Sequence, residues 1–176
     1  MNDTHIDDIL SLGQDITAKI ATFHFSSTDN SYSARSGMGE VTSAALERLA
    51  RAMPNLKKVI LQDTYAGEMD GYFAFAQFCP QITYFEAIGV PLKDEYFSEF
   101  TRHPEWAPNL KKMRISQPYN PNPKALAEMR KFSKARPRLP IQLLERSSVK
   151  KWGDWEYEEN VNPMQNGRMK TALHYS

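Results

Sequence analysis

One phrase of apolar residues recurs along the chain and constrains the fold more than any other feature. The segments "AMPNLKKVIL" (52–61) and "APNLKKMRIS" (107–116) are nearly the same, and "FCPQITYFEA" (78–87) is a looser copy. All three place apolar residues on the pattern L-x-x-L-x-L, as does "KIATFHFS" (19–26). Repeats at a short, regular spacing predict that the chain folds as stacked copies of one structural unit.

The copies begin at residues 20, 56, 82, 110 and 139, so the last four begin 26 to 29 residues apart. That spacing is close to the period of leucine-rich repeats. The fifth copy, "RLPIQLLER" (138–146), is degraded, because Leu139 and Leu144 fit the pattern but Gln142 does not. The residues that fill the first four copies are Ile20, Phe23 and Phe25; Leu56, Val59 and Leu61; Ile82, Phe85 and Ala87; and Leu110, Met113 and Ile115.

The segments between the copies have the periodicity of amphipathic helices. Residues 41–53 place Leu46, Leu49, Ala50 and Met53 on one face, with Thr42 or Ser43 as the N-cap. Helices are also predicted over 68–79, 92–103 and 122–135, although Gly71 weakens the first of these and Pro123 favours the start of the last. Each unit is therefore a short strand, a loop, a helix and a proline-containing turn.

The fold class that follows is α/β: a short leucine-rich-repeat-like solenoid in which parallel strands alternate with helices. Strands are expected near 20–25, 57–62, 82–87 and 111–116, paired in sequential order. We assign residues 1–15 to an N-terminal helix or cap, 16–146 to the repeats and 147–176 to a C-terminal cap or tail. The alternative is an ordinary α/β domain whose strands happen to alternate with helices.

The phrase after each amphipathic helix resembles the repeats of F-box/leucine-rich-repeat proteins, particularly the divergent fungal ones, over about residues 16–145. The resemblance implies a recognition module in a larger chain. Two departures limit it. No F-box-like segment precedes the repeats, so binding to a ubiquitin-ligase adaptor is not carried over. The position usually occupied by Asn or Cys after the strand is Thr64, Val90 or Pro118, so the usual backbone-bonding ladder is expected to be absent or replaced.

If the pattern residues point inward, the alternate residues of each strand lie on the concave face. One row is then His24, Ile60, Glu86 and Arg114, and its neighbour is Thr22, Lys58, Tyr84 and Lys112. A mixture of Tyr, Arg and an exposed Ile is typical of a recognition surface. The alternative is a solvated face on which Glu86 and Arg114 form an ion pair of little energetic value. The binding residues we predict are His24, Lys58, Ile60, Tyr84, Glu86, Lys112 and Arg114.

Signals of catalysis and of cofactor or metal binding are weak. His5, His24, His103 and His174 are scattered, and the single cysteine, Cys79, sits where the repeat requires a small buried residue. Neither a nucleophile elbow nor a phosphate-binding loop is present, and the Ser/Gly-rich stretch 26–40 is read as an insertion. We therefore expect no catalytic residues, no metal and no cofactor.

The balance of 22 basic and 21 acidic residues gives no global attraction to nucleic acid or anionic membrane. No window is apolar enough for a signal peptide or a membrane span, and the lone cysteine fits a reducing compartment, so a cytoplasmic or nuclear protein is expected. The predicted function is a non-enzymatic module that binds a protein partner on the concave face. The alternatives left open are a small α/β enzyme with an unidentified site, and a scaffold fragment of a larger F-box-like protein.

Overall fold

The computed structural model describes residues 2–26, 41–62, 70–89, 94–116, 123–152 and 154–169. This part of the chain is an α/β structure with six helices and one seven-stranded sheet. The elements, in chain order, are α1 (Asp3–Ser11), α2 (Gln14–Thr17), β1 (Thr22–Ser26), α3 (Ser43–Ala52), β2 (Lys58–Gln62), α4 (Asp70–Phe78), β3 (Tyr84–Ile88), α5 (Asp94–Arg102), β4 (Lys112–Ser116), α6 (Pro123–Ala135), β5 (Ile141–Lys151), β6 (Asp154–Gln165) and β7 (Arg168–Met169).

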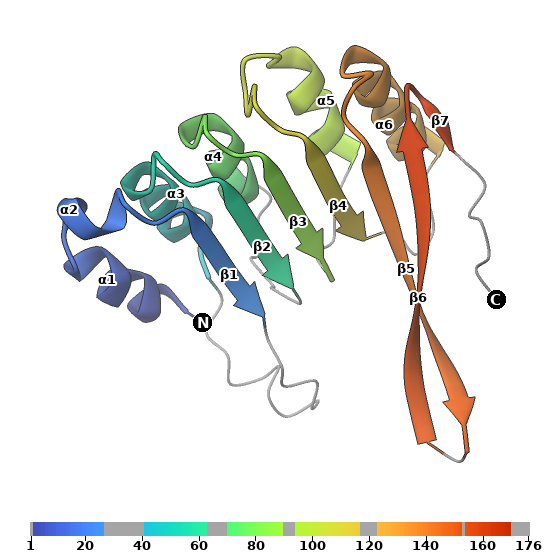
Figure 1. Cartoon of the computed structure of the whole chain (residues 1–176), viewed down its shortest axis with the longest axis horizontal. Helices are drawn as coiled ribbons and strands as arrows, with labels where there is room; N and C mark the ends of the chain where they lie inside the picture. The colour runs from blue at the N-terminus through green and yellow to red at the C-terminus, as the bar shows by residue number, and fades with distance from the viewer. Residues whose placement is uncertain are drawn as a thin grey trace.

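The seven strands lie side by side in the order in which they occur in the sequence (Figure 1). β1 to β5 pair in parallel, whereas β6 and β7 each run antiparallel to the strand before. The sheet is open, with β1 at one edge and β7 at the other. The four strands expected from the repeated phrase are confirmed, and so is their sequential parallel order.

The repeated apolar residues form the inner row of the sheet. Phe23, Val59, Phe85, Met113 and Ile141 follow one another in register across five strands, and each is 9% exposed or less. The helices α3 to α6 lie together on one side of these strands (Figure 1). Burying one such side chain stabilises a fold by about 1.5–3 kcal/mol, so a repeated inner row holds each unit to the next.

The helices predicted between the strands are confirmed with slightly shorter bounds. In α3 the apolar stripe is buried, and the Thr42 hydroxyl caps the helix by accepting from the backbone N–H of Ala45 at 3.2 Å. Gly71, which weakened the prediction of α4, allows close packing against α3. A Cβ at this position would lie 2.8 Å from the Cδ1 atom of Leu46, so only glycine fits there without a shift.

The turns between helix and strand contain a hydrogen bond that repeats with the sequence. The Asn55 side-chain amide donates to the backbone carbonyl of Ala18 at 2.9 Å, and the Asn109 amide donates to that of Pro80 at 3.0 Å. Both acceptors lie two residues before the first apolar residue of the preceding copy, so the two bonds are equivalent. Asparagine in the repeated "PNL" therefore joins neighbouring turns, a role that the apolar pattern did not indicate.

The fifth copy differs from its predicted alignment by one residue. Met113 pairs with Ile141, and both side chains are fully buried. Gln142, which the pattern required to be apolar, is instead in register with Arg114 on the opposite face. The prediction was wrong because the turn after Leu139 is one residue shorter than in the other copies. Side chains alternate between the two faces of a strand, so one missing residue moves the expected core-facing side chains to the opposite face.

The C-terminal segment covers the last parallel strand. β6 pairs with β5 along its length, with Met164 fully buried opposite Ile141, and the far part of this hairpin extends beyond the rest of the sheet (Figure 1). At its base the Gly167 N–H donates to the Ser133 hydroxyl of α6 at 3.0 Å. The expected boundary between repeats and cap at 146/147 falls inside the continuous strand β5.

At the other end of the sheet, α1 packs against α3. Ile6 is fully buried, and the Thr42 backbone N–H and hydroxyl donate to the Asp3 carboxylate at 2.9 and 2.8 Å. An exposed ion pair between Arg48 and Asp7 joins the same two helices. The insertion at 27–40 and the ladder positions Thr64, Val90 and Pro118 lie outside the described residues.

Candidate functional site

The face of the sheet opposite the helices carries the predicted binding residues. His24, Ile60, Glu86 and Arg114 are consecutive partners across β1 to β4, and Gln142 of β5 extends this row. The neighbouring row is Thr22, Lys58, Tyr84 and Lys112. We call this surface the open face; its described residues are Thr22, His24, Ser26, Lys58, Ile60, Gln62, Tyr84, Glu86, Ile88, Lys112, Arg114, Ser116, Gln142 and Leu144.

The predicted residues differ widely in their exposure. His24 and Lys58 are exposed, and Tyr84, Lys112 and Arg114 are half-buried. Ile60, which was expected to be an exposed apolar contact, is only 9% exposed. Strand alternation places it on the open face, where it is nevertheless almost completely buried, a result that a single strand's periodicity does not predict.

Glu86 is the centre of a hydrogen-bonded cluster on this face. Its Oε1 atom accepts from the Gln62 amide at 2.7 Å, and its Oε2 atom accepts from an Arg114 guanidinium N–H at 2.9 Å. The Tyr84 hydroxyl also donates to Oε2. With four groups from three adjacent strands, the cluster joins β2, β3 and β4 on the side away from the helices.

The cluster changes the interpretation of the predicted ion pair between Glu86 and Arg114. The Glu86 residue is 2% exposed and the Arg114 side chain 25% exposed, so this is not a solvated surface pair. A buried charge is tolerated only when it is paired and hydrogen-bonded, and Glu86 meets both conditions. The Arg114 Nε atom is buried and forms no hydrogen bond with any described residue.

The hydrogen bonds and charges keep Glu86 ionised. Burial alone raises the pKa of a carboxyl, but hydrogen bonds from Tyr84 and Gln62 and the charge of Arg114 outweigh it, so the pKa of Glu86 is below its ordinary value. Burial and the bond to Glu86 raise the pKa of Tyr84, which therefore stays protonated as the donor. The cluster is thus a fixed, charged arrangement at neutral pH.

Two lysines flank the ring of Tyr84 on the open face. The Nζ atom of Lys58 on β2 lies 5.0 Å from the ring centroid, and that of Lys112 on β4 lies 5.9 Å from it. Both distances are within the range of cation–π attraction. The aromatic ring and the two ammonium groups therefore form one continuous patch.

Sequence reasoning about single residues missed two contributors to this site. Gln62, the partner of Glu86, was not among the predicted binding residues, and Gln142 was read as a defect in the core pattern. A signal for Gln62 was available, because a glutamine diagonal to a glutamate on the next strand is within hydrogen-bonding reach. Gln142 carried no such signal, because the shorter turn after Leu139 shifts it out of the alignment with the earlier copies and onto the open face.

The residues weighed for chemistry have structural contacts. Cys79 is fully buried, its Sγ atom lies 3.3 Å from the Ala50 carbonyl oxygen, and burial raises the pKa of its thiol to about 12. The His103 ring stacks on Trp106 with centroids 4.3 Å apart. No group of three or more His, Cys, Asp or Glu side chains within the described ranges is arranged to hold a metal ion.

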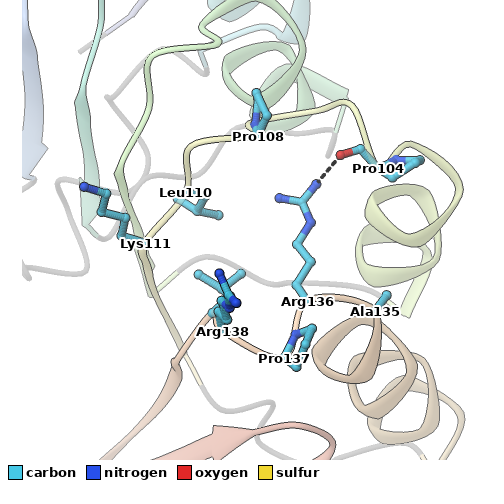
Figure 2. Close-up of a pocket in the computed structure, with 9 residues that line it drawn as sticks. Pro104, Pro108, Leu110, Lys111, Ala135, Arg136, Pro137 and Arg138 are labelled. Carbon is cyan, nitrogen blue, oxygen red and sulfur yellow. Dashed lines mark hydrogen bonds between the residues drawn. The ribbon is translucent and has the colours of Figure 1, made fainter.

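A pocket of about 460 Å³ lies between the turns that precede β4 and β5 (Figure 2). Arg136 points across it and donates to the backbone carbonyls of Pro104, Trp106 and Ala107 at 3.2, 2.6 and 3.1 Å. This guanidinium joins the two turns, as the asparagines join earlier ones, although the position equivalent to Asn55 and Asn109 is Arg138. The lining residues are Pro104, Pro108, Leu110, Lys111, Ala135, Arg136, Pro137, Arg138 and Leu139.

None of the helices in the described part of the chain is long and apolar enough to span a membrane. Comparison with protein-family models, with curated proteins and with solved structures found no match.

Proposed function

We propose that this chain is a non-enzymatic interaction module, built as a leucine-rich-repeat-like solenoid, that binds a partner protein across the open face. The sequential parallel strands, with one helix between each pair and equivalent asparagine bonds in two turns, support the repeat architecture. Repeat proteins of this kind commonly use the face without helices for binding.

The observation that carries the proposal is the Glu86 cluster. Tyr84 and Arg114, two residue types that are enriched at binding hot spots, are held in place by hydrogen bonds to one buried carboxylate. Side chains that are already ordered lose less entropy on association, so a preorganised patch binds more tightly than a mobile one of the same area.

The test is affinity capture from a cell extract with the tagged chain, followed by identification of bound proteins by mass spectrometry. Tyr84→Ala is expected to lose the specific partner, because it removes the aromatic centre of the patch. Arg114→Ala leaves Glu86 buried without its cation, so the double variant Arg114→Ala/Glu86→Gln serves as the better-folded equivalent.

The matched control is Lys131→Ala on the exposed surface of α6, away from the open face. Circular dichroism melts of each variant separate lost binding from lost folding. If the folded Tyr84 variant captures the same proteins as the unmodified chain, the open face is not the binding surface and the proposal fails.

A further inference from the structure

The charge that the open face presents to solvent comes from Lys58 and Lys112. They occupy equivalent positions on β2 and β4, on either side of Tyr84. Across the described ranges, neither lysine has a carboxylate within ion-pair distance. Their ammonium groups are held near an aromatic ring instead, as the cation–π distances show.

Glu86 does not neutralise these two lysines. Both of its carboxylate oxygens are occupied by Gln62, Tyr84 and Arg114, and the residue is almost completely buried. Its negative charge is balanced within the cluster by Arg114. The face as a whole carries three cationic side chains and one carboxylate among its described residues, so the excess is positive and lies in the row of Tyr84.

The spacing of the lysines sets the geometry of a complementary ligand. Adjacent strands are about 4.8 Å apart, so residues two strands apart are separated by about 10 Å at the backbone. Alternate side chains of an extended peptide point the same way and lie about 7 Å apart. The flexible lysine side chains can make up the difference between this spacing and the separation of about 10 Å between the backbones of Lys58 and Lys112. Carboxylates at alternate positions of an extended segment can therefore meet both lysines, with the intervening backbone over the Tyr84 ring.

We infer that the partner binds the open face through an extended acidic segment whose alternate aspartate or glutamate side chains pair with Lys58 and Lys112. This inference rests on the proposed function and specifies the chemistry of the partner. Nucleic acid fits the surface less well, because phosphate-backbone binding uses many lysines and arginines, and the chain has a net charge of only +1.

The experiment uses a fluorescein-labelled peptide of about twelve residues with alternating aspartate and threonine, long enough to cross four strands. Anisotropy titrations at about 50 mM salt compare it with an asparagine–threonine peptide, and both with a single-stranded oligothymidylate of similar length. The chain is expected to bind the aspartate peptide at least about tenfold more tightly than the other two probes. Raising the salt to about 500 mM is expected to weaken that binding several-fold.

Two charge-reversal variants locate the binding. Lys58→Glu/Lys112→Glu is expected to weaken aspartate-peptide binding by about tenfold or more. Lys57→Glu/Lys111→Glu makes the same change of net charge one residue away, outside the row that flanks Tyr84, and is expected to weaken binding less than about threefold. All four residues are at least partly exposed, so both variants are expected to fold, and thermal melts test this.

Several results would overturn the inference: no preference for the aspartate peptide, equal losses in the two double variants, or tighter binding of the oligothymidylate. Failure here is distinguishable from failure of the proposed function. If Tyr84→Ala abolishes capture of a partner while Lys58→Glu/Lys112→Glu leaves that capture unchanged, the open face binds a protein but not through acidic residues.

Discussion

Glu86 shows how one residue can have a role that its sequence position does not reveal. Strand alternation correctly places it on the face away from the helices, where a glutamate is normally solvated. Its burial depends on Gln62, Tyr84 and Arg114, which approach from its own strand and two neighbouring ones. The pairing of three strands therefore decides whether this carboxylate is a surface charge or the centre of a buried cluster.

Stability is expected to depend on pH through Glu86. Because its pKa is lowered in the folded state, its stabilising contribution is complete above the unfolded value of about 4.3 and is lost as pH falls through the folded value. Glu86→Gln is thus expected to be less stable than the unmodified chain by an amount that is constant from pH 7 down to about pH 4.3 and that shrinks as the pH falls further. Urea unfolding of both proteins at pH 7, at about pH 4.3 and at about pH 2.5 tests this; a difference in the free energy of unfolding that is the same at the lowest pH would contradict it.

Replacing tyrosine with phenylalanine is expected to have opposite effects at two positions. The Tyr96 hydroxyl is buried and forms no hydrogen bond within the described part of the chain, so Tyr96→Phe should leave the free energy of unfolding unchanged or raise it by up to about 1 kcal/mol. Tyr84→Phe removes a hydrogen-bond donor to the buried Glu86 carboxylate and should lower the free energy of unfolding by about 1–2 kcal/mol. Chemical denaturation measures both, and a marked loss for Tyr96→Phe would mean that its hydroxyl has a partner.

At the scale of the element, the repeated unit includes its turn as well as its strand. The apolar residues of the strand were recognisable because they recur at fixed positions; all are buried except Phe25, which is partly buried. Asn55 and Asn109 were equally visible in the repeated letters, but their role required a neighbouring turn to supply a carbonyl. The last turn uses Arg136 for the same purpose, which no alignment of the copies would suggest.

The turn bonds lead to a prediction at this scale. Asn55→Ala and Asn109→Ala each remove one hydrogen bond between adjacent units, so each should lower the free energy of unfolding by about 1 kcal/mol. Gln81→Ala, at the equivalent exposed position of the intervening copy, is the control and should change stability by less than about 0.5 kcal/mol. Equal effects at all three positions would show that the bonds contribute nothing specific.

At the scale of the whole molecule, the two ends of the sheet are covered in different ways. At one end α1 packs on α3 and bonds to its N-terminus through Asp3. At the other, the antiparallel strands β6 and β7 follow β5, and Met164 enters the core. Without these contacts, buried residues such as Ile6 and Met164 would have no core to enter.

The part of the β5–β6 hairpin beyond the sheet is expected to be dispensable for folding. Glu145 lies opposite Asn160, so residues 146–159 can be replaced by a two-residue Asn-Gly turn that keeps the register. A two-stranded ribbon contributes little stability, so Tm should change by less than about 4 °C. Met164→Ala, at the base of the hairpin, should instead lower the free energy of unfolding by about 2–5 kcal/mol. Differential scanning calorimetry compares the two, and unfolding of the shortened chain would contradict this division.

The sequence by itself determined the α/β class, four strands and their order, the helices between them and the face on which each residue of those four strands lies. These properties depend on local periodicity and on its recurrence, both of which a single chain displays. Only the tertiary structure decided the register of β5, the bonds between turns, the coverage of Ile60 and the burial of Glu86. Each of these arises from contacts between units, where one missing residue or one neighbouring side chain changes the outcome without altering the periodicity of any single strand.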